Sequence, residues 1–245
     1  MSLGRHTGYP RAARWLADLV YDLLRGLARA VSWRWRKSVA WHASLPDGPV
    51  LLAINHPTSL DPFVIASLIR RRMVFLTSYK LFHVPGLKLV LKAAGMVSAG
   101  AGNPRHALRG AIEALQAGYA LCVFPEGRIS PETGEVAHPR SGAARIALGA
   151  RVPVVPVGIY APAEHLRLLP VKVAGRQDKI RWYGGGPYAV TFGEPLMLDG
   201  RDATGREVRA LSQEIAQRIA ALAAESRGRV EPEPEPAADG QAHEA

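Results

Sequence analysis

The sequence predicts an α/β fold, a mixed and mostly parallel β-sheet flanked by helices, with an amphipathic helix in front of it. Short apolar runs, each long enough for one buried strand, alternate with segments in which apolar residues recur at steps of three and four. This alternation is typical of sheets whose strands are connected by helices. Hydrophobic residues make up 48% of the 245 residues, which is enough to fill the core of one large domain.

Composition limits the classes of protein to which the chain can belong. The one cysteine, Cys122, lies in an apolar run, so we expect no internal disulfide and an inert core residue. The net charge is +10, and all 31 lysines and arginines precede the last fifteen residues, which hold five acids. Such a basic body predicts an anionic partner: nucleic acid, an anionic membrane or a polyphosphate ligand. No apolar stretch is long enough to span a bilayer, and we expect no secretory signal.

Residues 1–37 predict a basic amphipathic helix. Its apolar face is formed by residues at three- and four-residue steps, namely Trp15, Leu16, Leu19, Val20, Leu23, Leu24, Leu27 and Val31. Tryptophans and cations alternate over residues 33–37, and residues 1–41 hold eight lysines and arginines against two aspartates. Indoles and long cationic side chains both suit the headgroup layer of a membrane. Packing of the apolar face against the domain explains the same pattern, so both interpretations stay open.

Residues 55–61, Asn-His-Pro-Thr-Ser-Leu-Asp, carry the first candidate for chemistry. The apolar run at 50–55 predicts a buried strand, and Asp61 followed by Pro62 predicts a helix start. His56 is then expected in the loop at the carboxyl end of a strand, where open α/β sheets bind ligands. An imidazole held by a carboxylate can act as a general base. The alternative is that Asp61 only caps its helix, a common role of aspartate at such a position.

Further elements are expected between this motif and residue 226. They are, in order, a helix at 62–72, a strand at 73–77, a helical segment at 80–92 broken at Pro85-Gly86, a helix from 103 to Gly118, strand 119–124, helix 141–148, strand 152–159, strands 180–183 and 188–192, and a helix from Thr204. The prolines of strand 152–159 favour irregular or edge pairing. A capping box at residues 204–207 begins the last helix, whose apolar face is Val208, Leu211, Ile215, Ile219 and Leu222.

The chain therefore divides into three expected parts. Residues 1–37 form the basic amphipathic segment, and residues 38–226 form the α/β domain. Residues 227–245 contain a Glu-Pro repeat that cannot build a core, which predicts a disordered acidic tail.

A second polar cluster, residues 125–128, follows the expected strand at 119–124. Because the carboxyl ends of parallel strands meet at one edge of a sheet, His56 and Arg128 are expected to share a cleft. Arg128 can grip a phosphate through two parallel hydrogen bonds, and Gly127 allows close approach to the backbone. The sequence contains no zinc-binding motif, phosphate-binding loop or nucleophile elbow. A base without an activated nucleophile favours direct transfer, in which it deprotonates a substrate hydroxyl that attacks a second substrate.

Four sequence blocks resemble those of the glycerolipid acyltransferases typified by 1-acylglycerol-3-phosphate acyltransferase. Residues 55–61 match the family's Asn-His-x4-Asp block, Lys80-Leu81-Phe82 its Lys-x-Leu-Phe segment, residues 124–127 its Phe-Pro-Glu-Gly block, and residues 152–157 its fourth block. The resemblance covers roughly residues 35–200, and the four blocks stand in the family's order and spacing.

This resemblance implies transfer of a fatty acyl group from an acyl-CoA or acyl-carrier-protein thioester to a lysophospholipid, by default lysophosphatidic acid. His56 would be the general base and Asp61 the carboxylate that orients it. Substrate-binding roles are implied for Asn55, Lys80, Arg105, Glu126, Gly127 and Arg128. No metal site and no cofactor besides the acyl donor are implied. Family members work at the cytoplasmic face of the cell membrane, so the N-terminal helix is expected to anchor the protein there, on an anionic membrane surface.

Two blocks depart from the family pattern. The second block normally ends in an arginine that grips the acceptor phosphate, and residues 95–100 contain none, although Arg105 can substitute for it. Arg128 follows Gly127 one place early. Both features resemble 2-acylglycerophosphoethanolamine acyltransferases, so another lysolipid acceptor is an alternative.

Two rival functions remain. A non-catalytic lipid-binding relative would explain the missing arginine, but it does not need an intact His56 and Asp61. Nucleic-acid binding is supported only by residues 33–37, and because no nucleic-acid recognition motif is present we expect no such partner.

Overall fold

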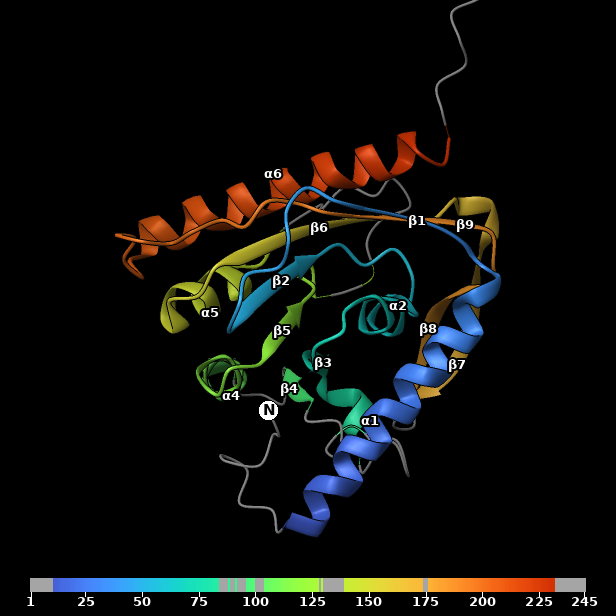
Figure 1. The fold of residues 1–245 in the computed structure, drawn as a ribbon, viewed down its shortest axis with the longest axis horizontal. Coiled ribbons are helices and arrows are strands. Elements are labelled where there is room, and N and C mark those ends of the chain that lie inside the picture. Colours follow the sequence, from blue (N-terminus) through green and yellow to red (C-terminus); the bar gives the residue numbers. More distant parts are fainter. Residues whose placement is uncertain are drawn as a thin grey trace, which may run out of the picture.

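In a computed structural model, the chain folds around a seven-stranded sheet with helices on both faces (Figure 1). The structure describes residues 11–83, 88, 91, 96–99, 104–127, 129, 139–173 and 176–231. The predicted α/β class is confirmed. Most of the expected acidic tail, and most of the predicted helical segment at 80–92, lie outside the described residues.

The main sheet is mixed. Its members, in spatial order, are β1 (Arg36–Trp41), β9 (Pro187–Phe192), β6 (Val154–Tyr160), β2 (Val50–Ile54), β5 (Ala120–Val123), β3 (Met73–Ser78) and β4 (Val97–Ala99). The last five strands are parallel, whereas β9 pairs antiparallel with β6 and parallel with β1. A separate two-stranded sheet pairs β7 (Leu166–Val173) with β8 (Arg176–Tyr183). Strands β1, β4 and β7 were not predicted.

Helices cover the two faces of this sheet unequally (Figure 1). They are α1 (Arg11–Val31), α2 (Asp61–Leu68), α4 (Pro104–Gln116), α5 (Gly142–Ala150) and α6 (Gly205–Gly228), with short 3-10 turns at Ser32–Arg34, Tyr79–His83 and Ala163–His165. One apolar cluster joins the sheet to α4, α5 and α6, and the other joins it to α2. Strand β2 lies between them, since Leu51 and Ala53 belong to the first cluster and Leu52 and Ile54 to the second.

Of the two alternatives for the proline-containing strand, the edge position is wrong, whereas irregular pairing agrees with the isolated bridge between Val154 and Leu196. β6 lies between β2 and β9, near the middle of the sheet. The carbonyl of Pro156 accepts a hydrogen bond from Gly193, which follows β9, so the proline nitrogen points to the same side. The ladder with β9 begins only at the next residue, Val157. The missing N–H of Pro156 therefore falls just beyond the end of β9, where no ladder bond is lost.

Helix α6 lies directly on β6 (Figure 1), and a glycine allows this close approach. A Cβ atom on Gly158 would overlap the backbone at Leu222 and Ala223. The five predicted apolar residues of the helix are all buried. Only half of the predicted capping box forms: the Thr204 hydroxyl accepts from the Glu207 N–H at 3.2 Å, and the Glu207 carboxylate instead accepts from Arg201.

The expected domain limits move by a few residues at each end. Arg36 and Lys37 already belong to β1, so the sheet begins inside the expected N-terminal segment. At the other end, α6 continues to Gly228, and Arg229 donates hydrogen bonds to the carbonyl of Val190 and the hydroxyl of Thr191. The sequence pattern missed this anchoring because arginine next to a Glu-Pro repeat resembles a solvated tail.

Two predicted helices also have different ends. The helix expected at 62–72 begins at Asp61 and ends at Leu68, and the helix expected to stop before Gly149 includes it.

Helix α1 contacts the domain through the buried Tyr21 and Ala28 and through polar bonds. The Tyr21 hydroxyl accepts a hydrogen bond from the Met73 N–H at 3.0 Å, and Asp18 pairs with Arg72. Three leucines of the predicted apolar face point outward instead; Leu23 and Leu27 are 63% and 60% exposed, and Leu19 is also exposed. Core packing therefore does not account for these three leucines. The side chains of Trp15, Leu16 and Val31 lie outside the described part of the chain.

Candidate active site

The candidate site lies where β2 and β5, which are neighbours, end. Asn55 and His56 follow β2, and Phe124 follows β5. The rings of His56 and Phe124 stack with centroids 4.1 Å apart and planes 20° apart. Because both strands are parallel, their carboxyl ends bring the two polar clusters to one edge, as predicted for an open α/β sheet.

Asp61 holds His56 through a short hydrogen bond. The Nδ1 of His56 lies 2.8 Å from Oδ2 of Asp61, whose side chain is fully buried. Asp61 is the first residue of α2, the N-cap position belongs to Leu60, and no side chain caps this helix. The alternative that Asp61 only caps its helix is therefore wrong.

Four donors surround the Asp61 carboxylate. Oδ2 accepts from the Thr58 N–H at 2.9 Å as well as from His56, and Oδ1 accepts from the hydroxyls of Thr58 at 2.6 Å and Tyr188 at 2.8 Å. An ionised carboxylate offers about four acceptor sites, so these donors satisfy it in its charged form. Since a carboxylate only accepts, Nδ1 of His56 carries the proton and Nε2 is the nitrogen that can take one. The His56 side chain is 17% exposed, so a substrate can reach it.

Tyr188 is a supporting residue that sequence reasoning missed. It is the second residue of β9, is fully buried, and packs with Trp35 and Tyr183 at ring-centroid distances of 5.3 and 5.8 Å. Burial, and then the charge of Asp61, raise the pKa of the Tyr188 phenol well above its ordinary value. The phenol therefore stays protonated, and its O–H donates the hydrogen bond to Asp61. No local pattern signals this role, because Tyr188 lies 127 residues from Asp61.

The loop that carries His56 is tied to β8. The Ser59 N–H donates to the Arg181 carbonyl at 2.9 Å, the Arg181 N–H donates to the Ser59 hydroxyl at 3.0 Å, and the Arg181 guanidinium donates to the Pro57 carbonyl at 3.3 Å. These three bonds fix the backbone on both sides of Thr58. Sequence reasoning predicted part of β8 but not its contact with this loop.

Asn55, for which the resemblance implies a role in substrate binding, bonds to the backbone of β6. Its side chain is fully buried, its amide nitrogen donates to the Ile159 carbonyl at 2.8 Å, and its amide oxygen accepts from the Ile159 N–H at 2.7 Å. The side chain thus extends the pairing of β2 with β6 by one step. Asn55 positions the backbone of His56.

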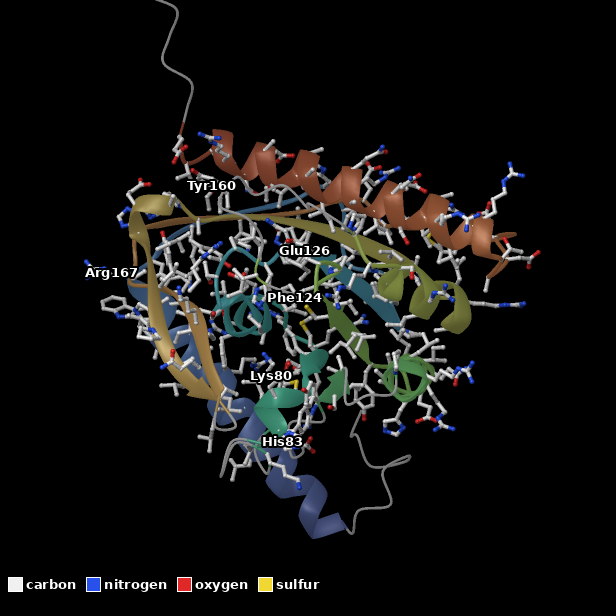
Figure 2. The ribbon with its side chains drawn as sticks, turned by 180° about the vertical axis from the view of Figure 1, so that it is seen from behind. Lys80, His83, Phe124, Glu126, Tyr160 and Arg167 are labelled. Atoms are coloured by element: carbon white, nitrogen blue, oxygen red, sulfur yellow. The ribbon has the colours of Figure 1, made fainter. Side chains whose placement is uncertain are left out.

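The turn after β5 places Glu126 and Gly127 beside the stacked rings. The Gly127 N–H donates to the Phe124 carbonyl at 3.0 Å, which closes the turn, and Gly127 has a φ of +64° that glycine adopts without strain. Glu126 is buried, and Figure 2 shows it close to Phe124. Arg128, the predicted phosphate ligand, lies outside the described residues.

Lys80 and Arg105 lie at the same sheet edge but farther from the base. Lys80 is in the 3-10 turn that follows β3, one strand from β5, and Figure 2 shows it below Phe124. Arg105 is exposed in the first turn of α4, which follows β4, two strands from β5. The strand order therefore makes Lys80 the better placed of these two predicted ligands.

The described residues give little support for a cysteine nucleophile or a metal site. Cys122 is buried in β5, and burial raises the pKa of its thiol well above the ordinary value, so the prediction of an unreactive core residue is confirmed. Among the residues that the structure describes, no cluster of three His, Cys, Asp or Glu side chains could hold a metal ion.

Known proteins resemble this chain in sequence and in fold. The "probable 1-acyl-sn-glycerol-3-phosphate acyltransferase" of Mycoplasma pneumoniae is 26% identical over 190 residues, which span 71% of this chain and 69% of that protein. The chicken "DGAT1/2-independent enzyme synthesizing storage lipids" is 26% identical over 205 residues, 73% of this chain but only 59% of that protein. The crystal structure of the 1-acyl-sn-glycerophosphate acyltransferase PlsC from Thermotoga maritima shares the fold, with a TM-score of 0.61 and 24% identity over 86% of this chain and 83% of that one.

The family model described as Acyltransferase matches residues 38–160, which include the whole His56–Asp61 loop and the turn at Gly127. The match spans half of the chain, and it agrees with the order of the four sequence blocks. The chain therefore belongs to the acyltransferase family, and the protein is an acyltransferase.

Proposed function

We propose that the protein transfers a fatty acyl group from an acyl-CoA or acyl-carrier-protein thioester to the free hydroxyl of lysophosphatidic acid, which yields phosphatidic acid. The observation that carries this proposal is the His56–Asp61 pair, in which a fully satisfied, buried carboxylate holds a partly exposed imidazole. The acceptor is proposed from the relatives, two of which are named for acylation of this lysolipid.

The geometry suits direct transfer between two substrates. Nε2 of His56 takes the proton of the acceptor hydroxyl as its oxygen attacks the thioester carbon, and Asp61 steadies the imidazolium that forms. The resulting tetrahedral intermediate collapses, the carbon–sulfur bond breaks, and the imidazolium returns the proton to the leaving thiolate. One ester and one free thiol are formed, and His56 is again neutral.

The test is thiol release in the presence of a panel of acceptors. Release from acyl-CoA or from acyl-carrier protein should depend on the lysophospholipid, and His56→Ala should lower kcat by about 10²–10⁴-fold. His106→Ala, at an exposed position on α4, is the matched control and should leave kcat unchanged. Full activity of a folded His56→Ala protein would contradict the mechanism. Preference for lysophosphatidylethanolamine would identify the other acceptor, and vesicle binding without any turnover would favour a non-catalytic relative.

We further propose that the enzyme lies on the cytoplasmic face of the cell membrane through α1. Besides the exposed leucines of α1, Trp33 in the turn after this helix is 75% exposed, and cations of the same segment suit anionic headgroups. None of the described helices combines the length and the apolar character needed to cross a bilayer. An orientation in the plane of the interface fits these side chains.

The β7–β8 hairpin carries exposed apolar side chains on both of its faces, since Leu168 pairs with Arg181 and Leu169 with Ile180. Leu168, Leu169 and Trp182 are exposed large apolar residues of the hairpin. The end of β8 is joined to the segment after α1, because the rings of Trp35 and Tyr183 meet edge to face at 4.8 Å. We therefore include the hairpin in the proposed membrane contact.

A further inference from the structure

The turn after β5 carries a cation that the predicted site residues do not include. The side chain of Arg140 lies over Gly127: a Cβ atom on that glycine would stand 3.1, 3.2 and 3.3 Å from Nη1, Cζ and Nε of Arg140. Three atoms of the planar group are thus almost equally distant from one point, so the guanidinium presents its face to the glycine. A guanidinium in this orientation directs its N–H bonds sideways, away from the backbone that it covers.

Arg140 is held to this turn by its backbone as well. Its N–H donates to the Pro125 carbonyl at 2.9 Å, while the turn itself is closed by the bond from Gly127 to Phe124. Any side chain at position 127 would push against the guanidinium, and it would also have to adopt a φ of +64°. Glycine at this position therefore lets the cation rest on the turn. Arg140 is at the same time exposed, so a ligand can reach it.

The cation lies close to the reacting centre. In a turn closed in this way the first and fourth Cα atoms are less than about 7 Å apart, so Gly127 is near Phe124. The ring of Phe124 in turn stacks on the ring of His56. A ligand that contacts both His56 and Arg140 must therefore place an anionic group a short distance from its hydroxyl. In a lysophosphatidic acid only the glycerol backbone separates the two.

We propose that Arg140 binds the phosphate of the acceptor. The proposal rests on the proposed function, and it assigns to Arg140 the task left open by the second sequence block, which lacks an arginine. Two parallel N–H bonds from the guanidinium edge would hold two phosphate oxygens, with a geometry that lysine cannot reproduce. The enzyme would then select acceptors that carry a terminal phosphate over neutral ones.

The kinetic test compares Arg140→Gln with the wild-type enzyme. KM for lysophosphatidic acid should rise about 10- to 100-fold, as for loss of a charge-assisted hydrogen bond, with little change in kcat or in the donor KM. Activity toward a neutral monoacylglycerol should not fall, and Arg140→Lys should restore only part of the affinity. Arg145→Gln is the matched control, because Arg145 is an exposed cation on the following helix, bonded to the Ser141 hydroxyl. An unchanged acceptor KM, or a rise in the donor KM alone, would overturn the proposal.

A binding experiment separates this proposal from the proposed function. NMR titration of the folded full-length protein with sn-glycerol 3-phosphate needs no turnover. Binding that is lost in Arg140→Gln and kept in Arg145→Gln supports the phosphate site even if no lysolipid is acylated. Equal binding by both variants, or no binding by the wild type, contradicts it. Gly127→Ala should weaken binding in the wild type but add nothing in Arg140→Gln, because both changes disturb the same contact.

Discussion

The Tyr188 hydroxyl is the most distant donor in sequence to the Asp61 carboxylate, and its removal tests how the candidate site is supported. Tyr188→Phe deletes one oxygen and keeps the ring that packs on Trp35 and Tyr183. The lost bond, 2.8 Å long and fully buried, ends on a charged acceptor. Bonds to charged groups contribute about 1.5–3 kcal/mol to the free energy of unfolding. For a chain of this size, Tm should fall by about 3–12 °C.

The same change should lower activity beyond its effect on stability. With one of four donors gone, Asp61 can turn relative to the His56 ring, and we expect kcat to fall about 10-fold, which corresponds to about 1.4 kcal/mol. KM for both substrates should stay near its wild-type value because Tyr188 is buried behind the site.

Tyr183→Phe is the matched control for this experiment. Tyr183 belongs to the same buried aromatic cluster, but its hydroxyl donates to the uncharged carbonyl of Pro187. Its removal should cost about 0.5–1.5 kcal/mol of stability and leave kcat unchanged. Thermal melts and steady-state kinetics of both variants decide the matter. If Tyr188→Phe behaves like Tyr183→Phe, or keeps full stability and activity, the reasoning about the carboxylate is refuted.

Three further outcomes follow from other parts of the structure. Replacing Leu23 and Leu27 by glutamine should lower flotation with anionic vesicles about 10²-fold or more without lowering Tm, since both leucines are exposed. Met197→Gln, at another exposed position, is the control and should leave flotation unchanged. Equal flotation of the leucine variant and the Met197 variant would argue against α1 as the membrane contact. The free energy of unfolding should fall as the pH rises above 10.0, because the unfolded chain then releases the Tyr188 proton that the folded protein keeps, and Tyr188→Phe should flatten this fall in urea titrations; an unchanged slope would contradict the raised pKa. Gly158→Ala should lower Tm by about 6–12 °C through overlap with α6, and a wild-type Tm would show that the helix can shift at no cost.

The sequence predicted what depends on local pattern. The alternation of apolar runs and helical periods was sufficient for the α/β class, and the spacing of His56 and Asp61 was sufficient to pair them, because both lie in one short loop. The expected edge position of β6 was wrong because the effect of Pro156 depends on where its neighbour β9 ends. That strand ends at Phe192, which is 36 residues from Pro156 in the sequence. The bonds of Asn55 to Ile159 could not be predicted, because they join residues 104 positions apart in the sequence.

The face of α1 could not be assigned from its pattern alone. A stripe of leucines has the same spacing whether it packs on a core or on a membrane. In the structure Tyr21 and Asp18 contact the domain and Leu23 and Leu27 are exposed, so packing on the core does not explain these two leucines. Arg140 could not be predicted either, since only the fold brings it back over Gly127.

The two ends of the candidate site are held in different ways, and this bears on how an acyltransferase can change its acceptor. The Asp61 carboxylate depends on Thr58 and Tyr188, both fully buried, so a change at either position leaves a buried charge with fewer donors. The contact of Arg140 with Gly127 is exposed on its outer side and involves no buried charge. If Arg140 binds the acceptor phosphate as proposed, substitution of this exposed side chain costs little stability and alters the group that the acceptor must carry. Acceptor specificity can therefore diverge within this fold while the general base and its carboxylate stay the same.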